Sequence, residues 1–273
     1  MKRLAAVALL AGAAFFLCPA SDGWSKGQME APVAQRPWLG VTMAEHGLRV
    51  VHVVRGSPAA QAGIVEGDAL EKVGSTVIAR GADVVRAVAE LAVGDSVAIT
   101  LLRAGSERTV RATLAPFPSP DDRMRMDLVG APAPAWKGLV AVRGDFPQSL
   151  AVLRGRVVLL DFWATWCVPC RVVMPRLGAL QDRFGAQGLR VFGVSTEDAE
   201  DVGVFVQRAG ARYAIGIDAA EETTRAYGVS GLPTLVAIDK RGVVRHVLVG
   251  YDPAEYGRLE ALVSSLISEP DRI

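Results

Sequence analysis

A proline-rich, charged stretch divides this chain into two parts with different patterning. Residues 115–127 read Ala-Pro-Phe-Pro-Ser-Pro-Asp-Asp-Arg-Met-Arg-Met-Asp, a composition typical of a connection between folded units. The 273 residues are enough for two domains of ordinary size. We therefore expect a first domain over 38–115, a linker over 116–127 and a second domain over 128–268.

The first 20 residues have the pattern of an export signal. Lys2 and Arg3 precede a 14-residue apolar run over 4–17, and Cys18-Pro19-Ala20 offers small residues to a signal peptidase. The run is shorter than the roughly 20 residues of a membrane span, which favours cleavage, with a retained N-terminal membrane anchor as the alternative. Residues 21–37 are polar and are expected to form a flexible tether. These features predict an exported protein of the periplasm or cell envelope.

Charge and cysteine usage narrow the possible functions. Lys plus Arg total 30 against 29 for Asp plus Glu, and no basic block stands out, so we expect no nucleic-acid partner. After signal cleavage only Cys167 and Cys170 would remain. In an oxidising compartment such a pair is a structural staple or a redox centre. A staple closing so short a loop would restrain little of the unfolded chain, which favours a reactive pair.

The first domain has short β-type runs separated by turns. Helical spacing places Val84 and Val88 on one helix face, with Asp83 or Ala82 expected near the N-cap. This pattern predicts a mostly β domain with two helices. The expected strands are 48–54, 69–73, 97–103 and 108–114, and the expected helices are 57–63 and 83–91.

Three separated motifs in this region resemble a PDZ domain of the bacterial HtrA type: Trp38-Leu39-Gly40-Val41, 56–60 and 63–70. The resemblance covers about 36–115 and implies binding of free, apolar peptide C-termini by addition of a strand. The N–H groups of the Trp38–Val41 loop would hold the terminal carboxylate. The groove would lie between the strand beginning at Gly40 and the helix with Val84 and Val88. The alternative is a domain that only packs against its neighbour.

The second domain alternates strand-like and helix-like segments. Its first strand is apolar except for Asp161, as in a strand buried on both faces. The pattern predicts an α/β domain with an antiparallel strand pair late in the sheet. The expected strands are 157–163, 189–194, 234–239 and 243–249, and the expected helices are 170–180, 199–209 and 259–267.

Cys167 and Cys170 have the spacing of a dithiol that exchanges disulfides. Cys167 precedes the expected helix, where free N–H groups and the positive dipole end favour a thiolate, the form that attacks disulfides. Cys170, one helical turn later, would resolve the mixed disulfide. Half of a zinc site is the alternative, but the chain has no second Cys pair and only three histidines. We expect no metal and no cofactor beyond the redox-active pair.

The segment from Asp161 to Pro175, with Gly231-Leu232-Pro233-Thr234 and the entry motif at 129–134, resembles the TlpA/ResA-like group of exported thiol–disulfide oxidoreductases. This resemblance covers about 127–268 and implies a thioredoxin-like fold. It implies a cis-proline loop at Pro233, where Leu232 offers backbone groups to substrate, and an acidic residue near the cysteines at Glu197.

The remaining roles follow from the residues around the pair. Trp166 is expected to be an exposed docking surface, whereas Trp163 is expected in the core. Asp161, a carboxyl in a buried strand, is a candidate proton acceptor for Cys170, as is Glu197. Ordinary structural roles remain open for both acids, and for Glu197 the alternative is a solvated loop acid.

The leading hypothesis is therefore an enzyme that exchanges disulfides in protein partners. The resemblance suggests a reductant supplied by a membrane thiol donor and serving redox homeostasis of the cell envelope. One alternative is a non-catalytic PDZ adaptor, although a scaffold would not need both cysteines and Pro233. Another is a thiol peroxidase, for which the sequence around Cys167 is a poor match.

Overall fold

The computed structural model describes residues 35–270. The predicted signal peptide and nearly all of the predicted tether lie outside these residues. Within 35–270, no helix is both long and apolar enough to cross a membrane. The N-terminal and C-terminal domains are described separately below.

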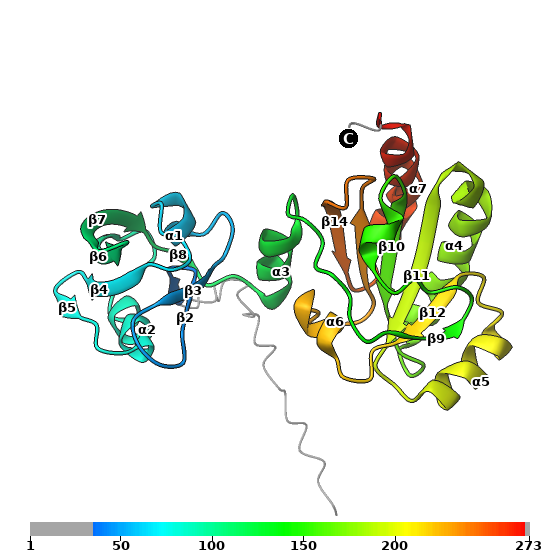
Figure 1. Cartoon of the computed structure of the whole chain (residues 1–273), viewed down its shortest axis with the longest axis horizontal. Helices are drawn as coiled ribbons and strands as arrows, with labels where there is room; N and C mark the ends of the chain where they lie inside the picture. The colour runs from blue at the N-terminus through cyan, green and yellow to red at the C-terminus, as the bar shows by residue number, and fades with distance from the viewer. Residues whose placement is uncertain (1–34, 271–273) are drawn as a thin grey trace, which may run out of the picture. The chain divides into compact units, whose positions relative to one another are not determined.

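The N-terminal domain is built on antiparallel β-structure with two helices (Figure 1). A four-stranded sheet has the order β5-β4-β6-β7, and the pairs β2-β3 and β1-β8 form two further ladders. The strands are β1 Pro37–Trp38, β2 Val41–Met43, β3 Val50–Val53, β4 Ala69–Val73, β5 Thr76–Val77, β6 Ser96–Arg103, β7 Ser106–Thr113 and β8 Ala115–Pro116; the helices are α1 Pro58–Gln61 and α2 Gly81–Ala89.

Local signals explain both helices. Ser57 caps α1, since its hydroxyl accepts the Ala60 N–H at 3.2 Å. Helix α2 begins two residues earlier than the expected start at Asp83, with Arg80 at the N-cap, and Ala82 and Asp83 lie near the N-cap as expected. Asp83 lies in the first turn, and its carboxylate reaches back to the N–H groups of Ala79 and Arg80, both at 3.0 Å. An acid that caps from the third helical position shifts the apparent start of a helix.

The segment predicted as a linker contains a helix, α3, at Pro120–Leu128. Ser119 caps it by accepting the Asp122 N–H at 3.0 Å, and Pro120 occupies the first turn. Met124 and Leu128 are buried in the core of the C-terminal domain. The capping signal was present in the sequence, but two buried residues are too few to show an amphipathic period.

The C-terminal domain has a six-stranded mixed sheet of order β14-β13-β10-β11-β12-β9. Strands β10, β11 and β12 run parallel, and β13, β14 and β9 pair antiparallel to their neighbours. The elements are α3, β9 Val140–Arg143, a 3-10 turn at Leu150–Leu153, β10 Val157–Phe162, α4 Val168–Phe184, a 3-10 turn at Gly185–Gln187, β11 Leu189–Ser195, α5 Ala199–Ala209, β12 Ala214–Ile217, α6 Glu222–Ala226, β13 Thr234–Ile238, β14 Val244–Val249 and α7 Pro253–Ser268.

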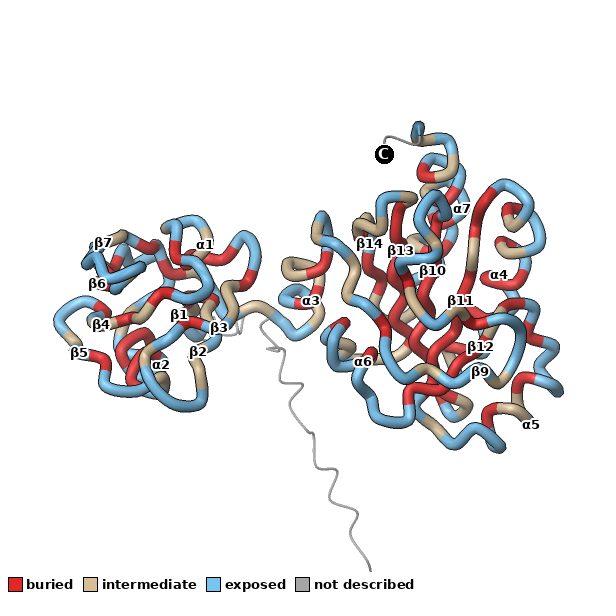
Figure 2. The backbone as a smooth tube through the Cα atoms, viewed as in Figure 1, coloured by how far each residue is buried: buried red, intermediate tan, exposed pale blue. Residues whose placement is uncertain are grey.

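Strand β10 lies inside the sheet and is buried along its whole length (Figure 2). Its residues alternate between two cores because neighbouring strand residues point to opposite faces. Val157 and Leu159 pack with residues of α4, α5 and α7 on one face. Val158 and Leu160 pack with α3 and the segment before β10 on the other. Asp161 belongs to the first set, so it faces the layer that contains α4.

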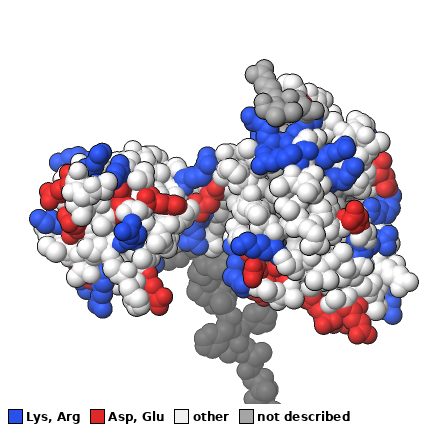
Figure 3. Space-filling model, in the orientation of Figure 1, with Lys and Arg blue, Asp and Glu red and all other residues white. Residues whose placement is uncertain are grey.

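The structure agrees with most of the expected elements and adds some. Helix α5 and strand β4 have the predicted bounds, and the antiparallel pair β13-β14 is present. Helix α7 begins at Pro253 rather than near 259. Strands β9 and β12 and helix α6 were not predicted, since each is only four or five residues long. On the face in view, acidic and basic side chains are interspersed over the N-terminal domain, whereas on the C-terminal domain basic side chains gather at the top of the view and acidic ones at the lower edge (Figure 3).

Candidate active site and peptide-binding groove

The cysteine pair lies where β10 leads into α4. After β10 the chain turns through 164–167, closed by the Cys167 N–H donating to the Ala164 carbonyl at 3.1 Å. Cys167 is the N-cap of α4, and its sulfur accepts the Cys170 N–H at 3.2 Å. The two residues form a disulfide. The sulfur of Cys167 therefore sits at the positive end of a 17-residue helix, which favours its thiolate form on reduction.

Exposed apolar side chains flank the buried disulfide. Trp166 and Val168, on either side of Cys167, are each 68% exposed, whereas Cys167 and Cys170 are 4% and 2% exposed. Trp166 and Leu232 line one cavity of about 280 Å³, together with Gly231 and Thr196. The two residues predicted to contact substrate thus meet at one surface beside the cysteines.

The loop before β13 forms the other wall of this cavity. The Leu232–Pro233 peptide bond is cis. The Thr234 hydroxyl donates to the Gly231 carbonyl at 2.7 Å, and the Pro233 carbonyl accepts the Gly250 N–H at 2.8 Å. These bonds fix the loop from both sides, so that Leu232 lies at the cavity rim.

Asp161 is fully buried beneath the site. The Tyr213 hydroxyl donates to its Oδ2 at 3.0 Å, and its Oδ1 has no hydrogen-bond partner within the described chain. Burial raises the pKa of Asp161 to about 7, against the opposing effect of the Tyr213 hydrogen bond. Burial and the adjacent Asp161 carboxylate also raise the pKa of Tyr213.

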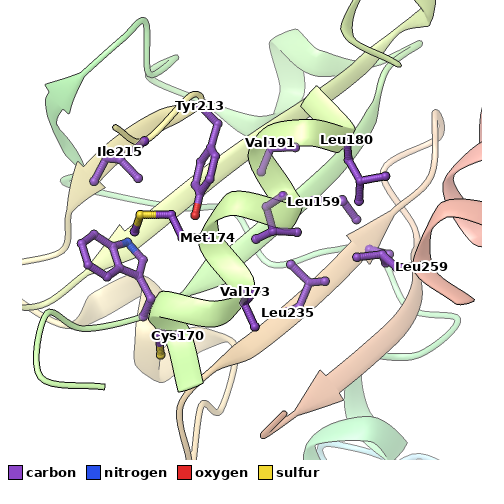
Figure 4. Packing of buried hydrophobic residues seen from close by; sticks show 14 of the residues in the cluster. Leu159, Cys170, Val173, Met174, Leu180, Val191, Tyr213, Ile215, Leu235 and Leu259 are labelled. Atoms are coloured by element: carbon purple, nitrogen blue, oxygen red, sulfur yellow. The ribbon is translucent and has the colours of Figure 1, made fainter. Parts of the chain in front are cut away.

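Asp161 and the cysteines share one side-chain layer. Cys170, Met174 and Tyr213 belong to one buried cluster, and Figure 4 shows Met174 of α4 beside Tyr213, with Cys170 nearer the start of the helix. Trp163 is 2% exposed, as predicted for a core residue, and its ring packs on Phe205 with centroids 5.6 Å apart.

Glu197 follows β11 and is half-buried. Its carboxylate accepts two hydrogen bonds from Thr165, one from the N–H and one from the hydroxyl, both at 2.6 Å. The Ser195 hydroxyl donates to it at 3.2 Å. The described residues form no hydrogen bond between Glu197 and either sulfur. Its predicted role as proton acceptor for Cys170 stays a prediction.

The N-terminal domain has a groove of about 170 Å³ between β2 and α2. All six residues predicted for peptide binding line it: Trp38, Leu39, Gly40, Val41, Val84 and Val88. Strand β2 pairs only with β3 among the described strands, so its other edge faces the groove. An unpaired edge beside an apolar helix face is the geometry that strand addition uses.

The loop before β2 is fixed through its carbonyl groups. The Leu39 carbonyl accepts the Ala59 N–H at 2.8 Å, and the Gly40 carbonyl accepts the Val54 N–H at 3.0 Å. Gly40 has a φ of +90°, and a Cβ there would lie 2.2 Å from the Cβ of Ser57. A glycine is therefore required at this position.

The structure also identifies residues that the sequence did not. Thr165 and Arg171 were not singled out, although both lie within or next to the cysteine motif. Tyr213 gave no signal, because its partner Asp161 is 52 residues away in the chain. Within 35–270, no group of three or more His, Cys, Asp or Glu side chains is arranged to hold a metal ion.

Two family models match the chain. The PDZ domain model matches 37–114, and the AhpC/TSA family model matches 129–247. These matches confirm the predicted two-domain organisation, with an N-terminal PDZ domain and a C-terminal thioredoxin-like fold.

Curated relatives and solved structures resemble the C-terminal domain. Thiol-disulfide oxidoreductase ResA of Geobacillus thermodenitrificans is 38% identical over 104 residues, 38% of this chain and 60% of the relative. ResA of Geobacillus kaustophilus is 35% identical over 123 residues, 45% of this chain and 70% of the relative. A crystal structure of a thioredoxin-family thiol:disulfide interchange protein from Chlorobium tepidum TLS is 30% identical, with a TM-score of 0.45, and the match covers 52% of this chain and 99% of that chain.

The chain thus spans 60% to 70% of the length of these two ResA proteins. The region that matches the AhpC/TSA family model, 129–247, contains the cysteine pair, the helix that follows it and the cis-proline loop. Through its C-terminal domain, the chain belongs to the ResA family of thiol–disulfide oxidoreductases.

Proposed function

We propose that this protein is an exported thiol–disulfide oxidoreductase that exchanges disulfides in protein partners. The observation that carries the proposal is the position of Cys167 at the N-cap of α4, disulfide-bonded to Cys170 and flanked by exposed Trp166 and Val168. A redox-active pair needs a stabilised thiolate and an accessible apolar surface, and this site supplies both.

Reduction of a partner would proceed in two exchanges. The Cys167 thiolate attacks one sulfur of the partner disulfide, forming a mixed disulfide and releasing a partner thiolate that takes up a proton. Cys170 then loses its proton and attacks the Cys167 sulfur. This step forms the Cys167–Cys170 disulfide and releases the second partner thiol. Two electrons pass to the partner, and a thiol donor must return them to the pair.

Asp161 is the residue we propose as the proton acceptor for Cys170. It lies in the side-chain layer that contains Cys170, and its pKa of about 7 lets it accept and release a proton near neutral pH. Its Oδ2 is held by Tyr213, and its Oδ1 has no partner in the described chain. Pro233 and Leu232 would hold the partner's backbone beside the sulfur.

We further propose that the protein acts as a reductant, with electrons supplied by a membrane thiol donor, and that its PDZ domain recruits partners by their C-termini. The groove between β2 and α2 supports the second point, because its valines suit an apolar terminal residue. The N–H groups of Leu39 and Gly40 form no hydrogen bond within the described chain and are available to a carboxylate.

An insulin-reduction assay run in parallel with a peroxide-reduction assay tests the activity. We expect dithiothreitol-driven insulin reduction well above the uncatalysed rate, loss of this activity in Cys167→Ser, and no peroxide turnover above background. Peroxide turnover without insulin reduction would indicate the thiol peroxidase alternative, and inactivity in both assays would favour the adaptor.

A further inference from the structure

Thr165 has every one of its hydrogen-bonding groups engaged by a charged side chain. Its N–H and its hydroxyl donate to the Glu197 carboxylate at 2.6 Å each. Its carbonyl accepts two hydrogen bonds from the Arg171 guanidinium, at 3.1 Å from Nε and 2.8 Å from Nη2. Hydrogen bonds to ionised groups are shorter and stronger than neutral ones. A residue two positions before the nucleophile is therefore held by an acid on one side and a base on the other.

Each of the two charged side chains is itself fixed by a neighbour. Glu197 is braced by Ser195, whose hydroxyl donates to its carboxylate at 3.2 Å and accepts the Glu197 N–H at 3.3 Å. Arg171 lies over the ring of Phe205, 5.5 Å from its centroid. Phe205 belongs to α5 and packs against Trp163 of the core. The two side chains thus connect Thr165 to the end of β11, through Glu197 and Ser195, and to helix α5, through Arg171 and Phe205.

The segment held in this way is the turn that presents the site. Thr165 and Trp166 are the central residues of the turn closed between Ala164 and Cys167. Trp166 is 68% exposed, so its own packing contributes little to its position. The hydrogen bonds to the N–H and carbonyl of Thr165 therefore fix the direction in which the Trp166 side chain projects into solvent. They also fix the position of the Cys167 sulfur at the start of α4.

We propose that Glu197 and Arg171 are positioning residues that clamp Thr165, so that Trp166 and Cys167 are held ready to receive the partner's disulfide. This inference rests on the proposed disulfide exchange and assigns Glu197 a role different from proton acceptance. Both carboxylate oxygens accept hydrogen bonds from Thr165, which leaves Asp161 as the acid for the proton-transfer step.

The two roles for Glu197 differ in their consequences. A proton acceptor controls how the rate depends on pH, and its neutral amide loses that function completely. A positioning residue controls order in the turn and the binding of partner. Glu197→Gln keeps one acceptor oxygen for Thr165 and should retain part of the clamp, whereas Glu197→Ala removes it.

The test combines amide hydrogen exchange with steady-state kinetics on the full-length protein. Exchange at the Thr165 and Cys167 amides, followed by NMR, reports order in the turn without requiring any activity. Insulin reduction gives kcat and KM across pH. The variants are Glu197→Ala, Glu197→Gln, Thr165→Ala, Thr165→Ser and Arg171→Ala. Glu200→Gln is the matched control, since it removes an exposed carboxylate three residues away.

We expect Glu197→Ala to exchange both amides about tenfold faster and to lower kcat/KM about tenfold, mainly through KM, with the midpoint of the pH profile unchanged. Arg171→Ala and Thr165→Ala should change both measurements in the same direction. Glu197→Gln should lose less of the protection and of kcat/KM than Glu197→Ala, and Thr165→Ser and Glu200→Gln should resemble the wild type. Unchanged exchange in Glu197→Ala would overturn the clamp. So would equal shifts of the pH midpoint in Glu197→Ala and Glu197→Gln. If the wild type does not reduce insulin, the proposed disulfide exchange is wrong. The amide hydrogen-exchange rates still show whether Glu197 and Arg171 hold Thr165 in place.

Discussion

The hydroxyl of Tyr213 donates a hydrogen bond of 3.0 Å to Oδ2 of Asp161, in the core of the C-terminal domain, where both residues are buried. Strand β11 makes this pairing possible. Gly193 lies directly beside Asp161 in the β10–β11 register and has no side chain, so Tyr213 of the adjoining segment can reach across to the carboxyl. The hydrogen bond lowers the pKa of Asp161, but burial raises it more, to about 7.

Replacing Asp161 by Asn should stabilise the protein at alkaline pH. The pKa of Asp161 is raised on folding from 3.8 to about 7, so the folded state binds the proton more tightly and loses stability as pH rises between these values. Above pH 7 the ionised Asp161 carboxyl lowers the free energy of unfolding by about 4 kcal/mol. An asparagine amide with an unsatisfied hydrogen-bonding group would itself be destabilising, so the substitution recovers only part of this amount. We expect Asp161→Asn to unfold with roughly 1–3 kcal/mol more free energy than the wild type near pH 8.

Urea unfolding across pH measures this difference. The advantage of Asp161→Asn should shrink as pH falls toward about 5, where the wild-type carboxyl is neutral. Tyr213→Phe is the companion variant: it removes the hydrogen bond that lowers the pKa of Asp161, so the loss of stability should extend to higher pH than in the wild type. A wild type and Asp161→Asn that keep a constant difference from acid to alkaline pH would contradict a raised pKa at Asp161.

Gly193→Ala should destabilise the C-terminal domain. An added Cβ would lie 2.6 Å from Cδ1 of Ile215 and 2.9 Å from Nε1 of Trp163, inside the layer around Asp161. Overpacking of this kind costs about 1–3 kcal/mol. Gly257→Ala is the contrast, because nothing lies within 4 Å of a Cβ there, and in helix α7 it should stabilise slightly. Thermal unfolding of both variants would show opposite shifts in Tm; a neutral Gly193→Ala would contradict the close packing.

Trp166→Ala should weaken partner binding without weakening the fold. Its side chain is 68% exposed, so truncation removes little buried area, and the free energy of unfolding should change by about 0.5 kcal/mol or less. KM for insulin should rise severalfold while the reduction potential of the pair stays close to the wild-type value. Val152→Ala, at a residue that is 70% exposed outside the site, is the matched control. Equal kinetics for the two variants would show that Trp166 does not contribute to partner binding.

Gly40→Ala should abolish peptide binding by the PDZ domain. The new Cβ would lie 2.2 Å from the Cβ of Ser57, in a backbone with a φ of +90° that disfavours alanine. Gly47 has a similar φ of +92°, but no atom lies within 4 Å of a Cβ placed there. Gly47→Ala therefore introduces backbone strain without a clash and serves as the control. Fluorescence anisotropy with the full-length protein and peptides ending in valine, free or amidated, measures the effect.

The free peptide should bind the wild type and Gly47→Ala, and the amidated peptide should bind both more weakly, because the carboxylate charge is lost. Binding that is indifferent to amidation would contradict carboxylate recognition by the loop at Leu39 and Gly40.

Most of the fold could be predicted from sequence patterns that lie within a single segment. The apolar run of β10 predicted its bounds to within one residue, the bounds expected for α5 were correct, and Ser57 with Pro58 marked the start of α1. Helix α3 was missed because its capping residues lie among prolines that are typical of linkers. Its two core residues, Met124 and Leu128, become meaningful only once the sheet they cover exists.

The reacting residues of the site could be predicted from the sequence, whereas the hydrogen bonds that hold them could not. The cysteines and cis-proline loop lie in short motifs, so their residues could be named from the sequence. The environments of Asp161 and Glu197 depend on residues brought together by folding. Tyr213 reaches Asp161 from 52 positions away and Thr165 is 32 positions from Glu197, and no local pattern encodes either pairing.

Covalent trapping tests the central claim, that Cys167 attacks and Cys170 resolves, most directly. Full-length Cys170→Ser and Cys167→Ser proteins would each be mixed with a peptide containing a single disulfide, quenched with acid and examined by mass spectrometry. Cys170→Ser should accumulate a mixed disulfide through Cys167, because the resolving thiol is absent, and Cys167→Ser should accumulate almost none. Trapping by Cys167→Ser alone would reverse the two roles, and trapping by neither variant would contradict disulfide exchange at this site.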